Sequence, residues 1–257
     1  MNYYNEIDPY AADWLRNLID AGHIALGVVD ERSIEDVRPD ELAGYVQCHF
    51  FAGLGGWAYA LDLAGWPRDR PVWTGSCPCQ PFSAAGKGAG FADERHLWPA
   101  WQHLINQCRP SVIFGEQVAK AAEWLRVVSS DLEGMDYAVG CMPIEAASAG
   151  GEDLRDRLYF VADCIKDGFN GARIPQEQRP RLSRAPRSFD GFPWASLPMP
   201  ANAEDFRSVL LLPDGASDDL ASIAAYGNAI NAQAAQAFIE SYCEARGLIF
   251  GEMAVAA

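Results

Sequence analysis

The sequence predicts an α/β fold, in which strands and helices alternate along the chain. Along its 257 residues the apolar pattern changes period several times, between the alternation typical of strands and the spacing typical of helices. The clearest single unit is a short apolar strand at 46–51, followed by a glycine turn and a helix at 57–64. Together with the lack of any internal repeat, these observations favour one main α/β domain.

The other elements of this domain are predicted in order along the chain. Apolar residues at helical spacing predict a helix over 10–20, and we interpret 1–45 as a helical and acidic lead-in that caps the core. Strands are expected at 72–74, 111–114, 137–141 and 158–162 because each is a short apolar or β-branched run. Helices are expected at 97–108 and 119–133. Residues 46–162 therefore form the expected main domain.

The pattern changes after residue 162. Residues 163–220 carry seven prolines, which are too dense for regular helices, and we expect a small irregular domain there. A helical pattern returns over 228–246, so 221–257 is expected to fold back onto the main domain.

Composition and charge limit the possible functions. The net charge of −15 makes the surface repel polyanions unless basic residues are concentrated in one place. Residues 173–187 are such a place, with five arginines against Glu177; the simpler interpretation is a solvated loop. The arginines are Arg173, Arg179, Arg181, Arg184 and Arg187.

The cysteines and the amino terminus indicate the compartment. Seven scattered cysteines, an odd number without repeated spacing, predict thiols in a reducing environment. No apolar run approaches the ~18 residues of a membrane span, and the first residues lack the features of a signal peptide. We expect a cytoplasmic protein that does not bind membranes.

Three local patterns suggest chemistry. The glycine turn 51–56 exposes backbone N–H groups to a nucleotide-like ligand, or simply packs a helix against a strand. Cys79 follows a strand beside two prolines, where a thiol can act as a nucleophile, although most buried cysteines are structural. A zinc site at Cys77 and Cys79 would need a second pair of ligands at a suitable spacing, which is absent from the sequence. Glu116 ends another strand, and Arg155 and Arg157 precede one; each is alternatively a solvated charge.

Taken together and in this order, these motifs resemble the DNA cytosine-5 methyltransferase family. Phe51-Ala52-Gly53-Leu54-Gly55-Gly56 resembles its cofactor loop, and residues 75–83 around Pro78-Cys79-Gln80 resemble its nucleophile motif. Glu116-Gln117-Val118 resembles its Glu-Asn-Val motif, Arg155-Asp156-Arg157 its paired arginines, and Gly227-Asn228-Ala229 its final motif. The resemblance implies a Rossmann-like class I methyltransferase sheet with a small recognition region at 163–220.

The resemblance also implies a role for each residue. Cys79 would add to carbon 6 of a flipped-out cytosine, Glu116 would donate a proton to nitrogen 3, and Arg157 would hold the base with Arg155 bracing Glu116. S-adenosylmethionine would bind at residues 51–56 with Asn228 and Ala229. Double-stranded DNA would be contacted by the arginines of 173–187 and by Gln80, Ser83, Lys87 and Arg95. No metal is implied, and we expect a monomer.

One departure from the family concerns the cofactor lobe. Only 18 residues separate Gly56 from Gly75, whereas a further strand and crossover helix would need roughly 30. We therefore expect a short, phage- or prophage-like member whose sheet lacks about one strand-helix unit. The acidic residue expected about 20 residues past the turn is missing, and Asp30 or Glu31 are the candidates to replace it.

The predicted function is methylation of carbon 5 of cytosine in DNA. Two alternatives stay open on the sequence alone. One is a relative without catalytic activity that binds DNA or has a regulatory role; the shortened cofactor lobe favours this alternative. The other is an enzyme that uses the same thiol addition on free cytosine nucleotides, against which the arginine cluster argues.

Overall fold

A computed structural model describes residues 1–78, 97–118, 121–145, 156–164, 230–248 and 250 of the chain. Within these residues, the fold is α/β, as predicted, and is built around one seven-stranded sheet. No helix of this part of the chain is long and apolar enough to span a bilayer.

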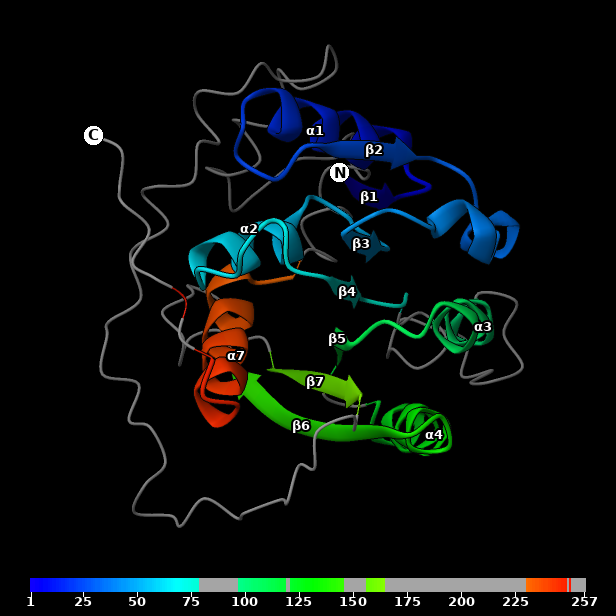
Figure 1. Cartoon of the computed structure of the whole chain (residues 1–257), viewed down its shortest axis with the longest axis vertical. Helices are drawn as coiled ribbons and strands as arrows, with labels where there is room; N and C mark the ends of the chain where they lie inside the picture. Colours follow the sequence, from blue (N-terminus) through cyan, green and yellow to red (C-terminus); the bar gives the residue numbers. More distant parts are fainter. Residues whose placement is uncertain (79–96, 119–120, 146–155, 165–229, 249, 251–257) are drawn as a thin grey trace, which may run out of the picture.

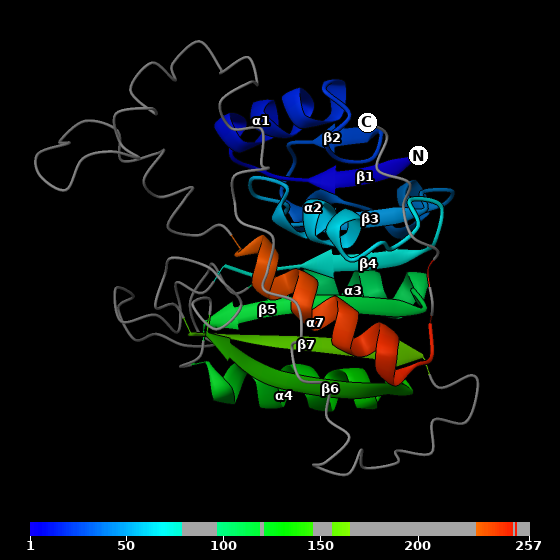
Figure 2. The same ribbon diagram turned by 90° about the vertical axis from the view of Figure 1, so that its left-hand side faces the viewer.

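The sheet has the strand order β2-β1-β3-β4-β5-β7-β6. Its first five strands are parallel, and β7 runs antiparallel to both of its neighbours. The strands are β1 (Asn2–Asn5), β2 (Gly27–Asp30), β3 (Gln47–Phe50), β4 (Val72–Gly75), β5 (Val112–Val118), β6 (Tyr137–Glu145) and β7 (Asp156–Cys164). The carboxyl ends of β1, β3, β4 and β5 therefore meet the amino end of β7 at one edge of the sheet (Figure 2).

Helices cover both faces of this sheet (Figure 1). One face carries α1 (Pro9–Asp20), α2 (Gly56–Leu63) and α7 (Ala232–Ala245), which bury Trp14, Trp57 and Phe238. The other face carries α3 (Trp98–Cys108), α4 (Ala122–Glu133) and two short 3-10 helices, η1 (Ile34–Asp36) and η2 (Pro39–Leu42). The predicted helices and the five predicted strands are all present, with small shifts at their ends.

The amino-terminal segment differs from the expected lead-in. Residues 1–45 contribute two strands, and β1 lies between β2 and β3 inside the sheet. The interval between Gly56 and Gly75 holds only α2 and a loop, as expected. The unit β1-α1-β2, which precedes the glycine turn in the chain, occupies that edge of the sheet instead.

The polar residues of β1 explain why the sequence did not predict it as a strand. Asn2 and Asn5 are buried at the two ends of the strand, where a short amphipathic pattern would place apolar residues. Their amides are satisfied by long-range partners: Asn2 donates to Gln47 Oε1 at 2.8 Å, and Asn5 donates to the Arg32 carbonyl at 2.8 Å. Only the folded sheet supplies these hydrogen bonds.

Candidate active site

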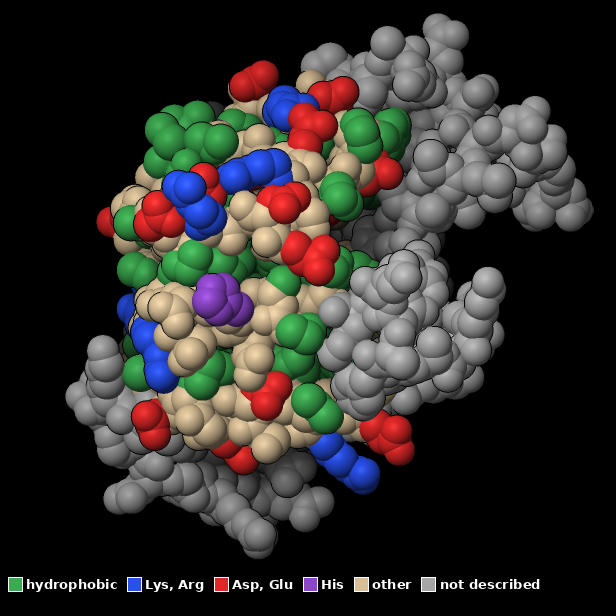
Figure 3. All heavy atoms as spheres, turned by 90° about the vertical axis from the view of Figure 1, so that its right-hand side faces the viewer, with side chains coloured by type: hydrophobic (Ala, Val, Ile, Leu, Met, Phe, Trp, Pro, Cys, Tyr) green, Lys and Arg blue, Asp and Glu red, His purple; other side chains and the backbone are tan. Residues whose placement is uncertain are grey.

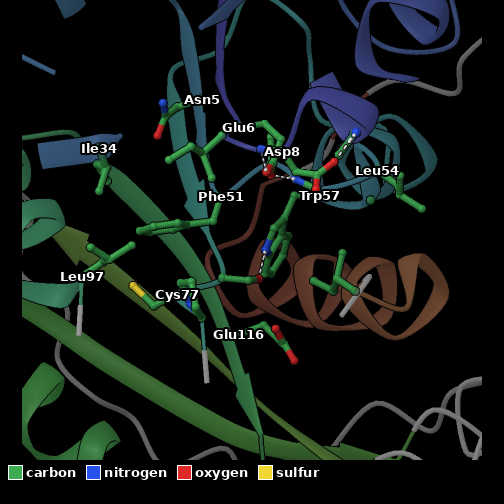
Figure 4. A pocket seen from close by; sticks show the side chains of 18 of the residues that line it. Asn5, Glu6, Asp8, Ile34, Phe51, Leu54, Trp57, Cys77, Leu97 and Glu116 are labelled. Atoms are coloured by element: carbon green, nitrogen blue, oxygen red, sulfur yellow. Dashed lines mark hydrogen bonds between the residues drawn. The ribbon is translucent and has the colours of Figure 1, made fainter. Parts of the chain in front are cut away.

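A cavity of about 260 Å³ lies where the carboxyl ends of the parallel strands meet (Figure 4). Its walls include six parts of the chain that are far apart in sequence. They are residues 5–8 after β1, residues 32–34 after β2, the glycine turn after β3, residues 76–78 after β4, and Glu116 and Arg157 on β5 and β7. Glu116, Arg157 and the predicted residues of the glycine turn except Gly55 therefore line one cavity, whereas Asp30 and Glu31 do not.

The glycine turn owes its shape to backbone that favours glycine. Gly53 and Gly55 have φ of 53° and 82°, and Gly55 caps the amino end of α2. At Gly56, an added Cβ would lie 2.3 Å from Ile230 Cγ2, so only glycine allows this close approach. Phe51 also adopts a positive φ, of 51°, which is unusual for a non-glycine residue and turns its ring toward the cavity.

Glu6 is the acidic residue beside this turn. Its carboxylate accepts hydrogen bonds from the backbone N–H of Gly53 at 2.7 Å and from that of Asp8 at 2.9 Å. Burial raises the pKa of the Glu6 carboxyl, and the two backbone donors oppose this shift. Glu6 thus presents a partly desolvated carboxylate at the cavity wall, directly after the strand that neighbours β3.

The two acidic candidates from the sequence, Asp30 and Glu31, have other partners. Asp30 accepts hydrogen bonds from the Tyr3 hydroxyl, at 2.8 Å, and from Arg32, while Glu31 pairs with Arg16 on the surface. Neither Asp30 nor Glu31 lines the cavity. Glu6 precedes the glycine turn in the chain, so spacing counted forward from the turn could not find it.

Two hydrogen bonds from other elements hold residues 76–78, the segment that precedes Cys79. Trp57 Nε1 donates to Ser76 Oγ at 3.1 Å, and Gln117 Nε2 donates to the Cys77 carbonyl at 3.3 Å. Cys77 itself is buried, and this burial raises the pKa of its thiol, so it stays protonated at neutral pH. Cys79 and the predicted DNA contacts Gln80, Ser83, Lys87 and Arg95 lie outside the described residues.

Glu116 and Arg157 form an ion pair at the cavity wall. Arg157 Nε lies 2.7 Å from Glu116 Oε1, and the two side chains are 21% and 8% exposed. Both residues lie in regular strand, two positions apart in the antiparallel register of β5 and β7, which fixes the pair. Arg157 therefore contacts Glu116, a contact that the sequence led us to expect of Arg155. Arg155 lies outside the described residues.

Comparisons with known proteins match these motifs. The family model for C-5 cytosine-specific DNA methylases matches residues 66–190. The type II methyltransferase M.HhaI of Haemophilus parahaemolyticus is 24% identical over 176 residues, which cover 52% of this chain and 53% of that protein. The type II methyltransferase M.NgoMIV of Neisseria gonorrhoeae is 33% identical over 153 residues, which cover 43% and 49%. Over residues 66–190, the chain is similar to the C-5 cytosine-specific DNA methylase family.

The chain covers between 25% and 53% of the length of such curated relatives. Among solved structures, a variant of Spodoptera frugiperda DNMT2 is similar with a TM-score of 0.43 and 16% identity, covering 73% of this chain and 48% of that one. The family model begins at residue 66, so β1, β2 and the glycine turn precede the matched range.

Several of the predicted site residues lie beyond the described chain. They are Arg155, the five arginines of 173–187, and Asn228 and Ala229. Ile230, which follows them directly, lines the cavity and packs against Gly56. Among the described residues, no three His, Cys, Asp or Glu side chains gather as a metal site would require.

Proposed function

We propose that this chain transfers a methyl group from S-adenosylmethionine to carbon 5 of cytosine in DNA. One observation carries the proposal: the cofactor-type turn with Glu6, the Glu116–Arg157 pair and the residues directly before Cys79 all line the same cavity. A cofactor held at one side would therefore lie beside a base held at the other.

The residues at the glycine turn fit an adenosine group. The Glu6 carboxylate offers acceptor oxygens for the two ribose hydroxyls, as an acid beside such a turn does in other nucleotide-binding folds. Phe51, Ile7 and Ile34 offer apolar surface for a flat base, and Ile7 is 64% exposed in the absence of a ligand. When bound, S-adenosylmethionine supplies an electrophilic methyl group.

The remaining residues suit activation of cytosine. The Cys79 thiolate would form a bond to carbon 6, and the ring electrons this displaces would make carbon 5 nucleophilic. Glu116 would donate a proton to nitrogen 3 as negative charge develops on the ring, while Arg157 holds the Glu116 carboxyl in place. Once carbon 5 carries the methyl group, return of the nitrogen 3 proton to Glu116 and loss of the carbon 5 proton to a base would break the bond to sulfur and release the Cys79 thiolate.

The groups that line the cavity cannot contact a base that is stacked inside a duplex, so the cytosine must be flipped out. Docking of the duplex is proposed at the arginines of 173–187. In the described chain, Arg32 and Arg38 are paired with Glu41 and Asp40, and Figure 3 shows acidic and basic side chains intermixed on the α3 and α4 face. Such a surface offers little net attraction to phosphates. A cytoplasmic location and a monomeric state stay predictions.

The short interval between Gly56 and Gly75 suggests that one wall of the cofactor site is missing. Residues 5–8 and 32–34, which follow β1 and β2, line the cavity and would supply that wall. The short interval alone would have predicted weak cofactor binding; with these residues in place, we do not expect it.

Methyl transfer to bacterial genomic DNA tests the proposal, because such DNA contains every short recognition sequence. Incubation with tritium-labelled S-adenosylmethionine should place label in 5-methylcytosine after digestion to nucleosides, and Cys79→Ser should abolish it. Label in free cytidine nucleotides but not in DNA would support the nucleotide enzyme instead. Cofactor binding without any transfer would support the relative without catalytic activity.

A further inference from the structure

Trp57 joins the two loops that form the proposed site. It is the second residue of α2, directly after the glycine turn, and its indole N–H donates to Ser76 Oγ at 3.1 Å. Ser76 is the first residue after β4 and stands three positions before Cys79. Trp57, which is labelled in Figure 4, lines the cavity together with Ser76 and Pro78.

The indole ring of Trp57 packs against aromatic side chains of the sheet. Trp57 is 3% exposed, and its ring centroid lies 6.0 Å from Phe114, nearly parallel, and 6.0 Å from Tyr159, nearly edge-on. Phe114 lies two positions before Glu116 on β5, and Tyr159 lies directly opposite Glu116 on β7. Because alternate residues of a strand share a face, Trp57 packs on the face that presents Glu116.

We propose that Trp57 is a positioning residue: through Ser76, it holds the backbone of residues 76–78, which leads directly to Cys79, in place relative to Glu116. The inference rests on the proposed function, in which these two groups act on one cytosine. Misplacement of a reacting group slows the chemical step more than it weakens ligand binding. The Trp57–Ser76 hydrogen bond should therefore govern the rate of thiol addition and leave cofactor affinity nearly unchanged.

The test removes one hydrogen-bonding group at a time. Trp57→Phe keeps an aromatic ring without the N–H, Ser76→Ala removes the acceptor, and Ser76→Thr retains a hydroxyl. The control is Trp66→Phe: Trp66 is also buried, also contacts Phe114, and donates to the Arg70 carbonyl at 3.2 Å, but it does not line the cavity. The readout is the rate of covalent adduct formation with genomic-sequence duplexes containing 5-fluorocytosine.

Loss of the hydrogen bond should slow adduct formation about three- to tenfold in Trp57→Phe and in Ser76→Ala. The double variant should be no slower than either single one, since both remove the same interaction. Ser76→Thr should restore most of the rate, and the cofactor Kd should stay within about twofold throughout. Equal rates in wild type, Trp57→Phe and Ser76→Ala, or an equal loss in Trp66→Phe, would overturn the inference.

Hydrogen exchange separates this inference from the proposed function. If the wild-type protein forms no adduct, the proposed function fails, and exchange of the backbone amides of Ser76 and Cys77 still decides the positioning role. Faster exchange there in Trp57→Phe and Ser76→Ala, but not in Trp66→Phe, supports it. Unchanged exchange in both overturns it.

Discussion

At the scale of single residues, we expect cofactor recognition to depend most on Glu6. Its two carboxylate oxygens already accept the N–H groups of Gly53 and Asp8, so its position relative to the glycine turn is fixed before any ligand arrives. A preorganised acceptor of this kind loses little entropy on binding.

Replacing Glu6 by Gln should weaken S-adenosylmethionine binding by about 10- to 100-fold, because hydrogen bonds to a charged acceptor are worth roughly 1.5–3 kcal/mol. Isothermal titration calorimetry measures this change. Glu31→Gln is the matched control. Glu31 is exposed, and within the described residues its carboxylate forms an ion pair with Arg16. Equal affinities of Glu6→Gln and wild type would exclude Glu6 from the cofactor site.

His49 is a second residue with a measurable consequence. It is buried on β3, where its ring stacks on Tyr4 at 4.8 Å and Nδ1 lies 2.8 Å from Thr74 Oγ1. Burial lowers the pKa of His49 to about 3. The unfolded chain, with an ordinary histidine pKa near ~6.5, therefore binds a proton more readily than the folded protein does.

The contribution of His49 to stability should thus be complete above pH ~6.5 and fall by about 1.4 kcal/mol per pH unit below it. Urea unfolding at pH 7, 6 and 5, for wild type and for His49→Gln, isolates this contribution because other titrating groups cancel in the difference. The free-energy difference between the two proteins should shift against wild type as pH falls. Parallel pH dependences would show that His49 is not held neutral.

At the scale of elements, the β5–β7 pair orients Glu116 and Arg157. Gly115 lies directly opposite Phe160, and a Cβ at Gly115 would come within 2.1 Å of the Phe160 ring. The ring thus covers the glycine, and the neighbouring residue Glu116 points to the opposite face.

Gly115→Ala should lower the free energy of unfolding by about 1–3 kcal/mol, because the fully buried Phe160 ring has to move. Gly140→Ala is the matched control in the same sheet: it lies opposite Val161, and its added Cβ would be 3.6 Å from Val161 Cγ1, an ordinary contact. Urea unfolding of both variants compares them. Similar stabilities would mean that the β5–β7 packing tolerates the methyl group.

At the scale of the whole molecule, the order of the strands in the sheet differs from their order along the chain. The unit β1-α1-β2 is first in sequence but lies beside β3 in the sheet and walls the cavity. It also buries a substantial part of the core, including Tyr3, Tyr4, Trp14, Leu15 and Leu18.

Deletion of residues 1–45 should therefore abolish both cooperative unfolding and cofactor binding, since it exposes an edge of β3 and removes Glu6. Near-ultraviolet circular dichroism during urea titration, with calorimetry of S-adenosylmethionine, measures both losses. A truncated protein that unfolds at the same urea concentration and binds the cofactor equally would show that this segment is a dispensable cap.

The sequence by itself determined the glycine turn, the strands on which Glu116 and Arg157 lie, and the resemblance to the methylase family, although β5 runs on to Val118 and does not end at Glu116. Each of these is a local pattern, in which neighbouring residues carry the whole signal. Tertiary structure alone decided the place of β1 and the position of Glu6 at the cavity, because the buried Asn2 becomes compatible with a strand only through a hydrogen bond to Gln47, 45 residues away. It also decided that Arg157 pairs with Glu116, since antiparallel register, and not spacing along the chain, brings the two side chains together.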